Sequence, residues 1–171
     1  AREKIASFLG RTANEIYFTS GGTESNNWAI RGAALSLKRR GNHIITTNIE
    51  HPSVLEVFKV LERQGYKVTY LNTDEDGFID INDLKKALTE DTVLVSIMYV
   101  NNEIGSIQPI SEAAEAIKSY NKNILFHVDA VQAFGKIDLV PALAGIDLLS
   151  VSGHKIHAPK GIGVLFVRDN A

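Results

Sequence analysis

Two lysines and two histidines lie within the twelve-residue segment SVSGHKIHAPKG, at residues 150–161. A lysine is a useful nucleophile only when desolvation or nearby cations neutralise its amine. Lys155 follows a predicted strand, with Ser152 and His154 just before it, at a place where a side chain can be partly enclosed, whereas Lys160 lies in a Pro-Lys-Gly turn and is expected to be solvated. Because most lysines are surface residues, the spacing makes Lys155 the better candidate without assigning it a reaction.

A glycine pair joins a predicted strand to a predicted helix in SGGTE, at residues 20–24. Backbone N–H groups at a helix N-terminus can bind an anion; Gly22 would let them approach it closely, and Thr23 adds a hydroxyl. The segment contains neither GxGxxG nor the P-loop pattern, so those two nucleotide-binding motifs do not apply. Two interpretations remain open, a phosphate cradle and a tight turn capped by Thr23.

The carboxylate of Asp129 follows the apolar strand ILFHV, where desolvation makes an unpaired charge costly. A protonated ring nitrogen of a ligand would be a suitable partner. Asp129 could instead cap the segment AVQAF that follows it. His127 lies two residues earlier on the same strand face, and packing alone would explain it.

Polar residues also follow two other predicted strands. His51 precedes Pro52, which favours an extended backbone. Its imidazole could pack or cap a helix, or it could stack on a flat ligand and transfer protons. Asn101 and Asn102 offer amide groups, although asparagine is also a common turn residue.

The sequence contains no cysteine, which excludes disulfides, thiolate metal sites and a cysteine nucleophile within these residues. A histidine metal site is not favoured either. The spacing of His154 and His157 is not that of HExxH, and no partner motif accompanies them.

Strand-like and helical patterns alternate along the chain. The predicted strands are residues 15–19, 43–47, 67–71, 92–98, 124–128, 147–151 and 163–167, and the clearest helices are 24–39, 53–63, 81–88 and 111–120. This alternation predicts an α/β fold with a mostly parallel sheet flanked by helices. Ligands of such folds bind at the carboxyl ends of the strands. Five polar clusters fall there, at residues 20–24, 50–52, 101–105, 129–132 and 150–155.

The composition is that of an ordinary globular domain: 171 residues, of which 44% are hydrophobic and 22% are charged. Eighteen basic and twenty acidic side chains give a net charge of -2, and their signs are interspersed. Neither a nucleic-acid partner nor a membrane surface is therefore expected. The expected partner is a small molecule or another protein.

The first residues, AREKIASFLG, are charged and amphipathic, so no secretory signal is predicted and a cytoplasmic location is expected. No apolar run approaches the roughly 18 residues of a membrane span. The chain begins within a predicted helix that lacks an N-cap and ends just after a predicted strand. We therefore expect a piece of a longer protein.

Five segments stand in order along the chain: FTSGGTESNN (18–27), IEHPSV (49–54), VNNEIGSIQPI (100–110), HVDAVQAFGKI (127–137) and SGHKIHAPKGIG (152–163). Together they resemble the large, cofactor-binding domain of the cysteine desulfurases, class V members of the pyridoxal-phosphate aminotransferase superfamily. The resemblance covers essentially the whole chain. It implies that residues 1–171 are the large domain of fold type I, truncated at both ends and without the small C-terminal domain.

The resemblance implies a site for pyridoxal 5'-phosphate. Lys155 would form the covalent imine with it and then act as the base at the substrate Cα. Asp129 would pair with the pyridine nitrogen and keep it protonated, so that the ring accepts electrons. His51 would stack on the ring and move protons. Gln132 would bond the phenolic oxygen, and Asn102 would lie beside that oxygen and the substrate carboxylate.

The same resemblance assigns the phosphate to two of the clusters. Thr23, Ser152 and His154 would hold it together with the backbone near Gly22, at a helix N-terminus.

The activity implied is the conversion of L-cysteine to L-alanine by a homodimer, with the sulfur passed as an enzyme persulfide to an acceptor protein for iron-sulfur cluster assembly or thiolation. The family's catalytic cysteine has no counterpart in this chain. We therefore expect these residues to bind the cofactor but not to complete turnover alone. The alternatives are another class V enzyme, such as a selenocysteine lyase or an aminotransferase, and a folded domain without catalysis that only binds or dimerises.

Overall fold

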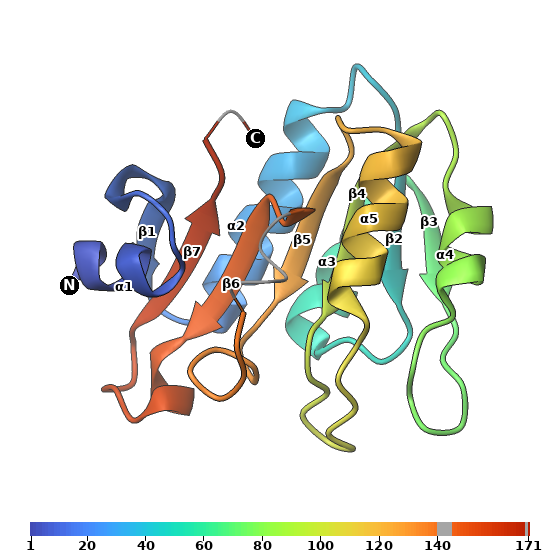
Figure 1. Cartoon of the computed structure of the whole chain (residues 1–171). Coiled ribbons are helices and arrows are strands. Elements are labelled where there is room, and N and C mark those ends of the chain that lie inside the picture. The colour runs from blue at the N-terminus through green and yellow to red at the C-terminus, as the bar shows by residue number, and fades with distance from the viewer. Residues whose placement is uncertain (140–144, 170) are drawn as a thin grey trace.

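A seven-stranded sheet forms the centre of this computed structural model, which describes residues 1–139, 145–169 and 171 (Figure 1). The strands lie in the order β1-β7-β6-β5-β4-β2-β3. Strand β7 is antiparallel to β1 and β6, and the other neighbours are parallel. Their bounds are β1 Ile16–Thr19, β2 His43–Thr47, β3 Lys67–Leu71, β4 Thr92–Met98, β5 Leu125–Asp129, β6 Leu148–Ser152 and β7 Gly163–Val167. The predicted mostly parallel sheet is confirmed, and each predicted strand is found within one residue at either end.

Helices cover both faces of the sheet, as predicted. Helices α2 and α3 share one buried cluster with the sheet, and α1, α4 and α5 share the other. Their bounds are α1 Arg2–Phe8, α2 Gly22–Ser36, α3 Pro52–Arg63, α4 Ile81–Ala87 and α5 Ile110–Tyr120, with short 3-10 turns at Ala13–Glu15 and at η3, Gly153–Ile156. Helix α2 begins and ends earlier than predicted, at residues 22 and 36 rather than 24 and 39. Among the described helices, none is long and apolar enough to cross a membrane.

Strand β4 is buried along its whole length because both of its faces are covered. Leu94 belongs to the cluster beneath α2 and α3, whereas Val95 and Ile97 belong to the opposite cluster. From Leu94 onward the side chains thus alternate between the two layers, as expected of a strand, whereas Val93 at the start of β4 shares the cluster of Leu94. Because apolar layers cover both faces of the sheet, polar side chains can gather at the carboxyl ends of its strands.

His127 is a core residue rather than a site residue. Its ring is buried in β5 between two hydroxyls, with Nδ1 2.8 Å from Ser96 Oγ and Nε2 2.9 Å from Ser150 Oγ. Burial lowers the pKa of His127 to about 3, so the ring is neutral near pH 7. The packing interpretation is therefore confirmed.

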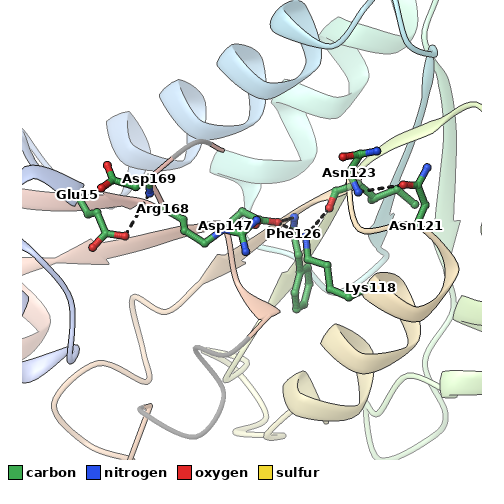
Figure 2. A network of polar contacts seen from close by, with 9 residues as sticks. Glu15, Lys118, Asn121, Asn123, Phe126, Asp147, Arg168 and Asp169 are labelled. Atoms are coloured by element: carbon green, nitrogen blue, oxygen red, sulfur yellow. Dashed lines mark hydrogen bonds and ion pairs between the residues drawn. The ribbon is translucent and has the colours of Figure 1, made fainter.

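A buried carboxylate holds together the other end of the central strands, at the starts of β5 and β6 (Figure 2). Asp147 precedes β6 with its side chain fully buried, and Lys118 Nζ and Arg168 Nη2 each lie 2.5 Å from one of its oxygens. It also accepts a hydrogen bond from Phe126 N–H at 2.7 Å. Lys118 donates in addition to the carbonyl of Ile124. The network joins α5 to the starts of β5 and β6 and to the end of β7.

We expect Asp147→Asn to destabilise the fold by about 3 kcal/mol, because two cations would lose the buried charge that they neutralise. The amide keeps the shape of the side chain and an acceptor for Phe126 N–H. The matched control is Asp83→Asn, which breaks the exposed pair with Lys86 and is expected to cost under about 1 kcal/mol. Urea unfolding of both variants measures these free energies, and equal losses would contradict the proposed anchoring role.

Candidate functional site

A cavity of about 270 Å³ lies at the carboxyl ends of the parallel strands. All nine residues predicted as site residues line it: Gly22, Thr23, His51, Asn102, Asp129, Gln132, Ser152, His154 and Lys155. Five further lining residues were not predicted: Asn26, Ser53, Met98, Val100 and Val131. The cavity thus brings together groups from all five sequence clusters, although their individual roles stay predictions.

Asp129 lies on the cavity wall as the last residue of β5, and it is 5% exposed. One carboxylate oxygen, Oδ1, accepts Val131 N–H at 3.0 Å, and Oδ2 accepts Asn26 Nδ2 at 2.7 Å. Burial raises the pKa of Asp129, while these two hydrogen bonds and the nearby His51 oppose that rise. The capping interpretation is confirmed, because Oδ1 caps the following turn, and pairing with a cationic ligand group stays a prediction.

Helix α2 presents an N-terminus without a side-chain cap to the cavity. Thr23 lies inside its first turn, so the interpretation in which Thr23 caps a tight turn is wrong. A Cβ at Gly22 would come within 2.6 Å of Val131 Cγ2 and 3.4 Å of Ser152 Cβ. Only glycine fits this close approach, and the helix dipole and backbone N–H groups make the place suitable for an anion.

The structure separates the two candidate lysines. Lys155 lies in η3, is half-buried and lines the cavity, whereas Lys160 is exposed in the turn before β7. Ser152 and His154 flank the same place, with Ser152 Oγ 2.7 Å from His154 Nδ1. His157 is exposed outside the cavity lining, in a left-handed conformation with φ 63°. Lys155 is therefore the lysine that can react with a ligand in the cavity.

His51 combines two of its predicted uses. Its backbone is extended, with φ −61° and ψ 146°, and Pro52 is the first residue of α3. As the N-cap residue, His51 accepts Ser53 N–H at Nδ1, at 3.1 Å. The ring is nevertheless exposed and lines the cavity, so its face is available to a flat ligand.

The two asparagines after β4 have different uses. Asn101 is buried, and its Oδ1 accepts the N–H groups of Glu103 and Ile104 at 2.8 and 3.0 Å. This is the turn interpretation, and it is confirmed for Asn101. Asn102 instead is exposed and lines the cavity.

The residues that sequence reasoning missed include Asn26, which lies four positions after Gly22 on α2. The helical period places positions i and i+4 on one face, so this spacing was a usable signal. Ser53 lies in the first turn of α3, and nothing in its local sequence distinguishes it from a capping residue. No group of three or more His, Cys, Asp or Glu residues that could hold a metal ion occurs in the described part of the chain.

Glu50 is a buried carboxyl group directly before His51, and the sequence had predicted no role for it. Its Oε1 accepts Thr47 Oγ1 at 2.8 Å and Met98 N–H at 2.7 Å, while Oε2 is buried without a partner in the described structure. Burial raises the pKa of Glu50 to about 8, with a smaller contribution from the charge of Asp129. Near pH 7 Glu50 is therefore mainly a neutral acid beside Asp129.

We expect Glu50→Gln to remove a pH-dependent loss of stability. The folded chain keeps the Glu50 proton up to about pH 8, whereas the unfolded chain releases it near pH 4.5. Between these values the wild-type free energy of unfolding falls as pH rises, by at most about 1.4 kcal/mol per unit from this group. The stability of Glu50→Gln relative to wild type should therefore grow from pH 4.5 to pH 8 in urea unfolding. A pH-independent difference would contradict a buried neutral acid.

Comparisons with known proteins identify the family of the chain. Residues 1–171 match the family described as "Aminotransferase class-V". "Cysteine desulfurase IscS" of Clostridium botulinum (strain Hall) is 52% identical over 169 residues, which are 99% of this chain and 42% of that protein. A "Cysteine desulfurase" of a Nostoc species is 54% identical over 168 residues, 98% of this chain and 41% of its own length.

Solved structures give the same result. A "NifS-like protein" superposes with a TM-score of 0.96 and 45% identity over 99% of this chain and 47% of its own. "SspA in complex with cysteine" superposes with a TM-score of 0.92 and 44% identity, over 99% of this chain and 49% of its own. The chain thus spans about two fifths of the length of the curated relatives it matches. It belongs to the class V aminotransferase family, and these relatives within it are cysteine desulfurases.

Proposed function

We propose that the cavity binds pyridoxal 5'-phosphate and that the chain is the cofactor-binding part of a cysteine desulfurase. The observation that carries the proposal is the meeting of three complementary groups in one cavity: the half-buried amine of Lys155, the buried carboxyl group of Asp129 and the uncapped N-terminus of α2. An aldehyde, a ring nitrogen and a phosphate are their respective chemical partners. The close approach at Gly22 leaves no room for a side chain, so the backbone N–H groups there stay accessible to a phosphate.

The chemistry that such a cofactor supplies is electron withdrawal from the substrate Cα. Asp129 would hold a proton on the ring nitrogen, because the ionised carboxylate and the pyridinium stabilise each other where water is excluded. Lys155 Nζ would bind the cofactor covalently and then take the Cα proton. Lys155 and His51 are the proposed catalytic residues.

The remaining lining residues would orient the cofactor. Thr23, Ser152 and His154 would contact the phosphate beside Gly22. Gln132 Oε1 accepts a hydrogen bond from Lys136 Nζ at 3.2 Å. Its amide nitrogen would then donate to the phenolic oxygen. Asn102 would donate to the same oxygen and to the substrate carboxylate.

The proposed substrate is L-cysteine, and the products are L-alanine and an enzyme persulfide. The names of the relatives support this choice, as does the cysteine complex of the SspA structure. The sequence contains no cysteine, so the thiol that takes the sulfur would lie in the part of the relatives' length that this chain does not span. A homodimer, a sulfur-acceptor protein and a cytoplasmic location belong to the same proposal.

We expect wild-type protein to gain an absorbance band near the edge of the visible range when pyridoxal phosphate is added, because Lys155 forms an imine. Borohydride reduction and peptide mapping should then locate one adduct per chain on Lys155. Lys155→Ala should lose the band and the adduct. The matched control, Lys160→Ala, should keep both, because Lys160 lies outside the cavity lining. Equal labelling of wild type and Lys155→Ala would overturn the assignment.

A further inference from the structure

Four side chains from three elements form a continuous hydrogen-bond chain along the cavity. It begins at Asp129 of β5, whose Oδ2 lies 2.7 Å from Asn26 Nδ2 of α2. The same Nδ2 lies 2.9 Å from Ser53 Oγ of α3. Ser53 Oγ lies 2.8 Å from Nδ1 of His51, the N-cap residue of α3. All four residues line the cavity.

Each hydrogen bond in this chain has a fixed direction. The amide nitrogen of Asn26 is a donor only, so it donates one proton to Asp129 and the other to Ser53 Oγ. Ser53 Oγ therefore accepts from Asn26 and has its single proton left for His51 Nδ1. This direction holds whether Asp129 is ionised or protonated, because Asn26 Nδ2 cannot accept.

A second donor reaches the same imidazole nitrogen. Ser53 N–H lies 3.1 Å from His51 Nδ1 and donates to it. A nitrogen that accepts two donors carries no proton of its own. The neutral ring must then carry its proton on Nε2, and it can donate only from there.

From these contacts we infer that Asn26 and Ser53 are positioning residues that join Asp129 to His51 and fix His51 as the Nε2-protonated tautomer. The use of this arrangement rests on the proposed function: Asp129 and His51 would contact the same flat cofactor. Asn26 then links the two residues through Ser53.

The fixed tautomer limits the part that His51 can play as a base. Its Nε2–H can donate a hydrogen bond, but the ring can take up a proton only at Nδ1, after both bonds from Ser53 have broken. Lys155 has no such hydrogen bond among the described residues and is left as the base. His51 in this tautomer therefore acts first as a hydrogen-bond donor.

The test is 15N NMR of the protein labelled at its histidine and asparagine side chains, without cofactor, with His51 assigned through His51→Gln. Wild type should show an unprotonated, hydrogen-bonded Nδ1 and a protonated Nε2. Ser53→Ala removes the hydroxyl but keeps the backbone donor, so Nδ1 should stay unprotonated while its signal moves towards that of a more weakly hydrogen-bonded nitrogen. Ser53→Thr should restore the wild-type signal, because it keeps a hydroxyl.

The amide of Asn26 gives an independent readout of the other link. Its two Nδ2 protons should differ in shift, and Ser53→Ala should move one of them while the proton bonded to Asp129 stays in place. A proton on Nδ1 of wild-type His51, or identical His51 and Asn26 signals in wild type and Ser53→Ala, would overturn the inference. Circular dichroism of Ser53→Ala establishes that the fold is retained.

These readouts do not depend on the cofactor. If Lys155 takes no pyridoxal phosphate but the NMR signals behave as expected, the proposed function fails and the hydrogen-bond chain stands. If Lys155 is labelled but the His51 signals do not respond to Ser53→Ala, only the inferred chain fails.

Discussion

The site depends on a carboxyl group held in a buried place at the end of a central strand. Asp129 closes β5, which lies between β4 and β6 in the middle of the sheet. Burial penalises its charge, and Val131 N–H, the Asn26 amide and, to a smaller extent, the nearby His51 offset part of that penalty. A cation placed against it is therefore strongly favoured. The other proposed contacts surround the place where the ring bearing that cation would lie.

Three of the buried carboxyl groups, Asp147, Glu50 and Asp129, are stabilised in three different ways. Asp147 is ion-paired with Lys118 and Arg168 at the amino-terminal ends of the parallel strands, where these ion pairs stabilise the sheet. Glu50 keeps its proton, and so adds no charge beside the site near pH 7. Asp129 has hydrogen bonds but no cation in direct contact among the described residues. This difference separates the carboxyl group suited to a ligand from the two that serve the fold.

Much of this arrangement could be predicted from the sequence, because strand period, apolar runs and strand-end polarity are local signals. They located all seven strands and the five polar clusters, and they favoured Lys155 over Lys160, whereas the nine cavity residues were assigned from the resemblance to a known family. What could not be predicted depends on contacts between distant segments. The Asn26 bond to Asp129 spans 103 residues, and the Glu50 bond to Met98 spans 48. One of the two open interpretations, a tight turn capped by Thr23, fails for a local reason: the glycines allow α2 to begin at Gly22, which places Thr23 inside the helix.

The central claim is that Asp129 holds a positive charge on the ring of a bound cofactor. The most direct measurement is 15N NMR of pyridoxal phosphate labelled at the ring nitrogen and bound to the protein at neutral pH. The account predicts a protonated ring nitrogen in wild type and an unprotonated one in Asp129→Asn, with the adduct on Lys155 present in both. An unprotonated nitrogen in wild type, or a protonated one in Asp129→Asn, would contradict it.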